Sequence, residues 1–112
     1  MYYLYIITLE DCPFSIAALE LLDSLNIEYK HRIVSQTNKE KYKTKEIDTF
    51  PQIYLVKYGT KLLLGGYDKL KEFIKVFKNQ EYNKKNILHF QNEYKLWNKK
   101  SILRLLTIIN KK

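Results

Sequence analysis

The chain has 112 residues, of which 46% are hydrophobic, so it is long enough for one domain with a modest core. Its single cysteine excludes an internal disulfide, and no apolar run approaches the roughly 18 residues of a membrane span, so we expect a soluble, cytoplasmic protein. The net charge is +8, and nearly all of the excess lies in residues 78–112, which hold 9 basic against 2 acidic side chains. Because 18 of the 20 basic residues are lysine, a bias that an AT-rich genome also produces, we expect no nucleic-acid partner.

A candidate nucleophile follows the first predicted strand. The aromatic and β-branched run 2–8 predicts a buried strand, and the residues after it read Glu10-Asp11-Cys12-Pro13-Phe14-Ser15. Apolar side chains at helical spacing predict a helix from Pro13 to about Leu25, and proline suits a first helical position. Cys12 then lies near the helix N-cap, where free N–H groups and the helix dipole favour a thiolate, the nucleophilic form. The alternative is a cysteine that serves as a small buried hydrophobe.

The middle of the chain predicts a second strand and a polar helix. Residues 27–34 alternate well enough for a strand, and its place after a strand and a helix implies a parallel pair. Thr37 and Glu40 have the spacing of a capping box that opens a helix to about Ile47. The Phe50-Pro51 step interrupts it, because the residue before a proline is pushed towards an extended conformation.

A hairpin and a last core helix follow. Residues 52–57 and 61–64 predict two strands, which a short turn at 58–60 joins. Asp68 is placed to cap a helix whose apolar side chains follow the i, i+3, i+4, i+7 pattern, namely Leu70, Phe73, Ile74 and Phe77. The order β-α-β-α-β-β-α up to residue 77 indicates an α/β fold with helices on the faces of a small sheet.

The remainder of the chain is a basic extension. A polar run at 78–85 indicates a boundary between a domain of residues 1–78 and an extension of residues 79–112. Ser101 is placed to cap the second of two amphipathic segments, whose apolar residues are Ile87, Phe90, Tyr94 and Trp97 in the first and Ile102, Leu103, Leu106 and Ile109 in the second. We expect the extension to dock on the core; the alternatives are a dimer contact, an acidic membrane surface or another protein partner.

Three motifs in this order resemble a glutaredoxin, a family with a thioredoxin-like fold and a four-stranded mixed sheet. The motifs are Cys12-Pro13-Phe14-Ser15, Thr49-Phe50-Pro51 and Gly65-Gly66-Tyr67-Asp68, and with the element order they cover residues 2–77. The resemblance implies a catalytic centre at Cys12 and Ser15 and a glutathione site formed by Pro13, Phe14, Phe50, Pro51, Tyr67 and Asp68. It also implies that Pro51 is cis and faces the cysteine, and that the Phe50 backbone pairs with the cysteinyl main chain of glutathione. Tyr67 and Asp68 would hold the γ-glutamyl end of glutathione at the start of a helix.

Departures from the family pattern bear on the chemistry. Ser15 stands where similar proteins usually have a second cysteine, so any turnover must use glutathione as the resolving thiol. Phe14 replaces a common tyrosine and lacks its hydroxyl. Glu10 and Asp11 stand where the family generally has a basic residue, and two carboxylates at this position oppose the thiolate.

These residues support one main hypothesis and two alternatives. The main hypothesis is a glutathione-dependent thiol-disulfide oxidoreductase that acts on glutathionylated or disulfide-containing proteins, with Cys12 as nucleophile. One alternative is a catalytically weakened interaction module, which recruits a second copy or another protein through residues 79–112. The other is an iron–sulfur carrier in which Cys12 of two subunits and two glutathiones ligate the cluster, although Pro13 counts against it. His31 and His89 lack metal-ligand spacing with Cys12, so no metal site is predicted in the single chain.

Overall fold

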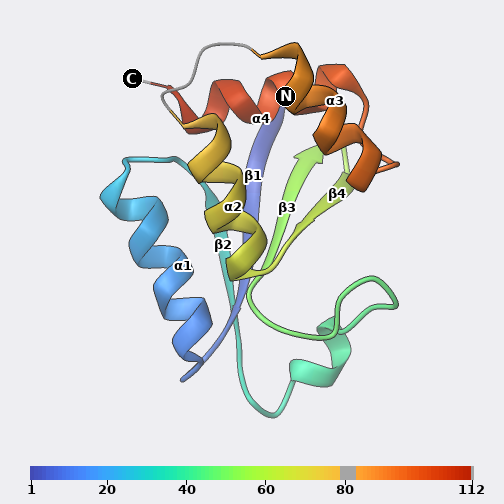
Figure 1. Cartoon of the computed structure of the whole chain (residues 1–112). Coiled ribbons are helices and arrows are strands. Elements are labelled where there is room, and N and C mark those ends of the chain that lie inside the picture. Colours follow the sequence, from blue (N-terminus) through green and yellow to red (C-terminus); the bar gives the residue numbers. More distant parts are fainter. Residues whose placement is uncertain (79–82, 112) are drawn as a thin grey trace.

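The computed structural model of the protein describes residues 1–78 and 83–111. Its elements follow in the order β1 (Tyr2–Leu9), α1 (Pro13–Ser24), β2 (Lys30–Val34), the 3-10 turn η1 (Lys39–Tyr42), β3 (Gln52–Lys57), β4 (Thr60–Gly65), α2 (Tyr67–Phe77), α3 (Lys84–Glu93) and α4 (Lys99–Ile109). Figure 1 shows the sheet behind α1 and α2, with α4 across the end at which β1 begins. Within the described ranges, each helix is too short or too polar to cross a bilayer.

The four strands form one mixed sheet in the order β2-β1-β3-β4. β1 pairs with β2 in parallel, whereas the β1–β3 and β3–β4 pairs are antiparallel. The parallel pair arises because α1 carries the chain back to the start of the sheet before β2 begins. This arrangement confirms the predicted four-stranded mixed sheet and places the carboxyl end of β1 beside the first turn of α1.

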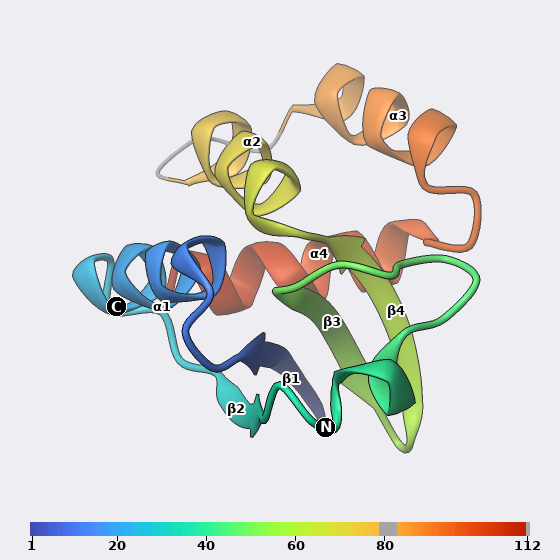
Figure 2. The same cartoon turned by 90° about the horizontal axis from the view of Figure 1, so that it is seen from below.

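One face of the sheet is covered by helices and holds the main core. Figure 2 shows α1, α2 and α4 on the same side of the strands. Leu4 and Ile6 of β1 are at most 1% exposed, and α1 places Leu22 against the same cluster. Other members of this cluster come from β3, α2 and α4, and include Ile53, Leu55, Leu70, Phe73, Ile102 and Leu105. The helical spacing of these apolar residues is what the sequence predicted for α1 and α2.

The other face of the sheet is covered by a loop in place of the predicted helix. A smaller cluster there contains Val34, Phe50 and Tyr54, with Tyr42 of η1 packed against it. The predicted helix of residues 37–47 is wrong, because this segment has too few apolar side chains to bury a helical face. Thr37 does not cap it, since its hydroxyl shares a 3.0 Å hydrogen bond with the Ser35 hydroxyl.

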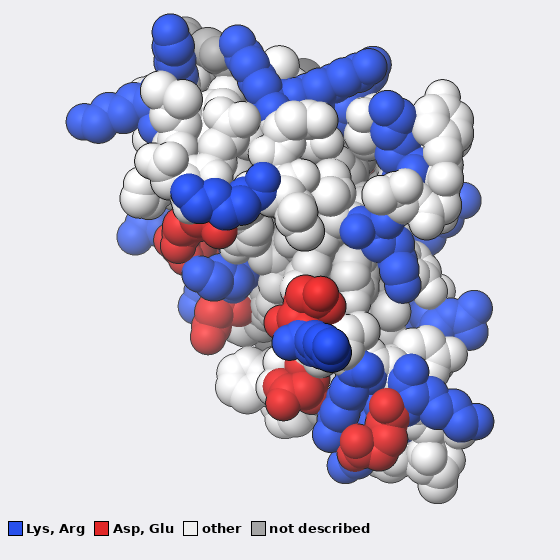
Figure 3. Space-filling view, turned by 90° about the vertical axis from the view of Figure 1, so that its right-hand side faces the viewer, with Lys and Arg blue, Asp and Glu red and all other residues white. Residues whose placement is uncertain are grey.

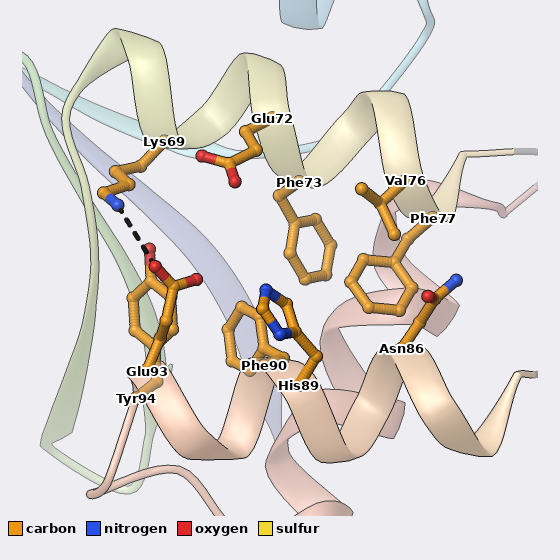
Figure 4. Close-up of a pocket in the computed structure, with 10 residues that line it drawn as sticks. All are labelled: Lys69, Glu72, Phe73, Val76, Phe77, Asn86, His89, Phe90, Glu93 and Tyr94. Atoms are coloured by element: carbon orange, nitrogen blue, oxygen red, sulfur yellow. Dashed lines mark ion pairs between the residues drawn. The ribbon is translucent and has the colours of Figure 1, made fainter.

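The extension packs on the helical face and belongs to the same core. Ile87, Phe90, Trp97, Ile102, Leu105 and Ile109 are all buried in the main cluster, which confirms the predicted intramolecular docking. Figure 4 shows how α3 lies along α2, with the Phe90 ring 5.4 Å from the Phe73 ring in an edge-to-face contact. A 3.8 Å ion pair between Lys69 and Glu93 lies at one end of this contact.

Two details of the extension differ from the sequence prediction. Asn98 rather than Ser101 is the N-cap of α4, and its side chain accepts a hydrogen bond from the Ser101 N–H at 2.8 Å. The buried stripe of α4 runs through Ile102, Leu105 and Ile109, whereas Leu103 and Leu106 are only partly buried. The predicted boundary run of residues 78–85 includes residues 79–82, which lie outside the described ranges.

The extension also covers part of the outer edge of the sheet. β4 is an edge strand, whose outward carbonyl groups have no strand partner. The Trp97 indole N–H donates to the Leu63 carbonyl at 3.1 Å, and the indole itself is 4% exposed. The segment between α3 and α4 therefore satisfies one of the groups that an edge strand leaves open.

Candidate functional site

Cys12 lies at the N-cap of α1, as the sequence predicted. The backbone of Cys12 is extended, and its carbonyl accepts the first helical hydrogen bond from the Ile16 N–H at 3.0 Å. Pro13 occupies the first helical turn, where the missing N–H costs no hydrogen bond. The turn before it needs a positive φ of 57° at Asp11, which lets the chain leave β1 and enter α1 within three residues. The thiol is partly exposed and faces the field of the helix N-terminus.

The thiol lies against a cis proline from a distant loop. The Phe50–Pro51 peptide bond is cis, and the Cys12 thiol lies 3.8 Å from the Phe50 carbonyl oxygen, to which it can donate. Both loop residues are buried, so their main chain has a fixed position beside the sulfur. The peptide bond before Pro51 is thus cis, as the resemblance implied, and the carbonyl of that peptide lies next to the thiol.

Ser15 lies one helical turn after Cys12 but is directed into the protein. Its side chain is 1% exposed, and its hydroxyl oxygen accepts a hydrogen bond from the Leu9 N–H at 3.1 Å. This bond ties the last residue of β1 to the first turn of α1. The contact gives Ser15 a structural role beside the thiol, which its sequence position alone did not indicate.

Phe14 and Tyr67 form an aromatic wall next to the thiol. Their ring centres are 6.3 Å apart, and the Phe14 side chain is 60% exposed. The Lys71 ammonium lies 5.3 Å from the centre of the Tyr67 ring and brings a cation to this wall. The sequence analysis did not single out Lys71, because the predicted helix was capped by Asp68 and so left Tyr67 outside it; in the structure both lie in α2 at i, i+4 spacing, on one face.

The N-terminus of α2 borders the cis-proline loop. Gly66 is the N-cap of α2, so the prediction that Asp68 caps this helix is wrong; Asp68 lies exposed in the first turn. A Cβ atom at Gly66 would meet the Pro51 carbonyl oxygen at 3.5 Å, an ordinary contact distance. The start of α2 at Gly66 therefore borders the loop that contacts Cys12, which brings segments of all three motifs together.

Glu10 is held by the connection after β2. One Glu10 carboxylate oxygen accepts the Gln36 N–H at 2.9 Å, and the Gln36 side-chain amide donates to the Glu10 carbonyl at 2.8 Å. The sequence analysis treated Glu10 and Asp11 alike, yet Glu10 makes these hydrogen bonds, whereas Asp11 lies exposed in the turn. Since Gln36 is 26 residues away, local sequence reasoning had no signal for this pair of bonds.

Gln52 anchors the loop that carries the cis proline. It is fully buried, and its amide donates to the Tyr42 carbonyl at 2.8 Å while its oxygen accepts from the Tyr54 hydroxyl at 2.9 Å. Burial raises the pKa of Tyr54, and the carboxylate of Glu46 adds to this effect. A glutamine in an otherwise apolar strand is the signal that could have indicated this role, because a buried amide needs partners.

The two histidines lie apart from the thiol site. His31 Nε2 is 2.6 Å from the Thr8 hydroxyl, and burial lowers the pKa of His31. His89 lies exposed on α3. In residues 1–78 and 83–111, no three His, Cys, Asp or Glu side chains are grouped as metal ligands.

Comparison with known proteins found similarity to glutaredoxins in the N-terminal part of the chain. Residues 4–57, just under half of the chain, match the family model for glutaredoxin. The structure is similar to that of glutaredoxin 1 from Francisella tularensis complexed with cacodylate, with a TM-score of 0.51 and 21% identity over 71% of this chain and 100% of that one. No curated protein matches the chain significantly. The chain therefore has the thioredoxin-like fold of a glutaredoxin structure, and its first half carries the glutaredoxin sequence pattern, including Cys12 and Pro51.

Proposed function

We propose that the protein is a glutathione-dependent thiol-disulfide oxidoreductase that works with one cysteine. The observation that supports it best is the Cys12 thiol at a helix N-cap, 3.8 Å from the carbonyl oxygen that precedes a cis proline. An exposed thiol in the field of a helix N-terminus is a favourable nucleophile. A reducing compartment such as the cytoplasm would supply the glutathione that the reaction consumes.

The proposed reaction has two exchange steps. The Cys12 thiolate attacks the glutathione sulfur of a glutathionylated protein, a Cys12–glutathione disulfide forms, and the substrate leaves as a thiolate that takes up a proton. A second glutathione thiolate then attacks the bound glutathione sulfur, which forms glutathione disulfide and releases Cys12 as thiolate. The substrate thiol is set free, and one free glutathione is oxidised as it joins the glutathione that came from the substrate. Because the chain has one cysteine, no internal thiol can replace the second glutathione.

The residues around the thiol fit the parts of glutathione. The main chain at Phe50 and Pro51 would pair with the cysteinyl residue, and the ring wall of Phe14 and Tyr67 would cover it, with Pro13 beside them. The γ-glutamyl group carries a carboxylate and an amine, which suit the N–H groups at the start of α2 and the Asp68 carboxylate respectively. Lys71 adds a cation near Tyr67.

The test is reduction of a glutathionylated peptide with glutathione in excess. We expect Cys12→Ser to lose at least about 90% of the rate, because a serine hydroxyl is hardly ionised at neutral pH. Phe14→Ala should raise KM for the peptide with a smaller effect on kcat, as expected for a wall residue. A Cys12→Ser variant with more than about a tenth of the wild-type rate would contradict the mechanism.

A second candidate is an interaction module whose redox centre is weakened. It is favoured by the Glu10-Asp11 pair before the thiol and by Leu88 and Leu96 of the extension, which are 51% and 84% exposed. In this second function, the partner is either another protein or a second copy of the chain. This candidate predicts that wild type and Cys12→Ser are equally slow in the peptide assay, while Leu96→Asp changes the sedimentation of the protein alone or of a partner complex.

A further inference from the structure

We propose that the protein binds single-stranded nucleic acid at the end of the sheet opposite Cys12. A hollow of about 380 Å³ lies where the start of β1, the β3–β4 hairpin and α4 meet. Its lining includes Tyr2, Lys57, Tyr58, Lys100 and Arg104. Figure 1 places this end of the molecule, marked by the N-terminus and α4, away from the end at which α1 begins.

Three cations from separate parts of the chain meet in this hollow. Lys100 and Arg104 are one turn apart on α4, and Lys57 ends β3. The Lys57 ammonium and the Arg104 guanidinium lie 5.1 Å and 5.3 Å from the centre of the same Tyr2 ring. The described lining residues include no Asp or Glu. In Figure 3, which shows an adjoining face, the described residues at the end of the molecule where α4 lies show Lys and Arg side chains and no acidic ones.

Tyr58 adds an aromatic ring at a position that the turn itself does not favour. Tyr58 and Gly59 link β3 to β4 with positive φ values of 48° and 83°. Such turns favour Asn, Asp and Gly, and a bulky side chain at positive φ is strained. The Tyr58 side chain is 82% exposed, and its ring centre is 5.6 Å from the Lys57 ammonium. An exposed ring held at a strained position beside cations points to a function for the ring.

A second hollow continues the first around Tyr2. It has a volume of about 620 Å³, shares Met1, Tyr2, Thr107 and Ile108 with the first hollow, and adds Lys30 and Lys111. Glu28 also lines it, but its carboxylate is 3.3 Å from the Lys111 ammonium. Two adjoining hollows with cations form a track, which suits a strand of several nucleotides better than a single nucleotide.

The chemistry of this track matches sequence-independent binding of a single strand. Phosphates would contact Lys57, Lys100 and Arg104, and a base would stack on Tyr58. The sequence analysis expected no nucleic-acid partner because a lysine-rich composition alone is weak evidence for one. The fold changes that expectation, because it brings the basic α4 next to the hairpin tip and its exposed tyrosine.

The test is fluorescence anisotropy of a labelled oligothymidylate of about eight nucleotides with the full, untagged chain at about 50 mM salt. We expect the triple variant Lys57→Ala, Lys100→Ala, Arg104→Ala to bind the oligonucleotide at least about tenfold more weakly. The slope of the logarithm of the binding constant against the logarithm of the salt concentration should fall in magnitude by roughly two, at about 0.7 for each lost phosphate contact. The control triple variant Lys41→Ala, Lys45→Ala, Lys75→Ala removes the same charge from exposed positions elsewhere. Equal losses in both variants, or no binding by the wild type, would overturn the proposal.

A single substitution at Tyr58 tests the stacking step separately from folding. Asparagine tolerates positive φ, so Tyr58→Asn should keep or raise the melting temperature while it weakens oligothymidylate binding about fivefold or more. Undiminished binding would overturn the stacking assignment. Polyglutamate at the same charge concentration should not displace the oligonucleotide; if it does so equally well, the track is a general anion site. Cys12→Ser should bind the oligonucleotide like wild type, which separates this site from the redox proposal.

Discussion

The Ser15 hydroxyl joins the end of β1 to the start of α1 and thereby fixes the turn that presents Cys12. Removing it in Ser15→Ala takes this partner from the partly buried Leu9 N–H, next to a side chain that is 1% exposed, so we expect a loss of about 1–3 kcal/mol in unfolding free energy. Urea unfolding measures this loss. Ser24→Ala is the matched control, because the Ser24 hydroxyl also makes a backbone hydrogen bond but is exposed, and its change should stay within about 0.5 kcal/mol. Equal losses for the two variants would show that burial of the Ser15 side chain does not strengthen its hydrogen bond.

His31 makes the stability of the fold depend on pH in mildly acidic solution. Burial lowers its pKa below the ordinary value of 6.5, and the charge of Asp23 opposes only part of this effect. As the pH falls through 6.5, the unfolded chain takes up the proton before the folded chain does, so stability present above that pH is lost. We expect a lower urea midpoint at about pH 5.5 than at about pH 7.5, and a smaller difference in His31→Gln. His89→Gln should keep the wild-type difference; if it removes the difference instead, His31 is not the responsible group.

Among the elements, α4 allows two neighbouring leucines to be compared. Leu105 is 1% exposed in the main core, whereas Leu106 is only partly buried at its margin. Leu105→Ala should therefore lower the unfolding free energy by about 2–5 kcal/mol, and Leu106→Ala by about half as much or less. Thermal and urea unfolding of the two variants provide the measurement. A larger loss for Leu106→Ala would mean that α4 is rotated about its axis relative to this description.

The elements that could be predicted are those whose local pattern agrees with their packing. The strand before Cys12 and the helix after it were predicted because aromatic and β-branched residues give way to apolar residues at helical spacing. The prediction of a helix at residues 37–47 was wrong because a capping box does not stabilise a helix that lacks a buried apolar face. Tyr42 and Ile47 alone do not provide such a face. The α4 stripe was misplaced by one position, since Leu105 and Leu106 both fit a helical spacing and only the packing distinguishes them.

In the candidate site too, local sequence patterns predicted the local features but not the contacts between residues far apart in the chain. The N-cap position of Cys12 follows from neighbouring residues, whereas its contact with Phe50 spans 38 positions and entered the prediction through a family resemblance alone. The bonds from Gln36 to Glu10 had no counterpart in any local pattern, and the polar Gln52 in an apolar strand indicated a need for partners without identifying Tyr42 as one. Such contacts depend on where loops return to the sheet, which periodicity does not specify.

At the scale of the whole molecule, the extension completes the core rather than following it as a separate unit. Removing residues after Lys78 would uncover Phe73 and Phe77, which pack against Phe90. We expect the truncated chain to aggregate or to melt at a lower temperature than the full chain, while Cys12 still reacts with a thiol reagent in the fraction that stays folded. Melting followed by circular dichroism measures the thermal stability, and thiol labelling measures the reactivity of Cys12. A truncated chain as soluble and as thermally stable as the full one would contradict this expectation.

Trp97 gives the molecule an intrinsic optical reporter. It is the single tryptophan of the chain, so fluorescence excited selectively at indole reports on one contact, that between the extension and the Leu63 carbonyl on β4. A buried indole emits at shorter wavelength than one in water, so release of this segment would shift the emission to the red even if the sheet stayed intact. A red shift at a lower temperature than the loss of far-ultraviolet ellipticity would therefore show that the extension detaches from β4 before the protein unfolds globally.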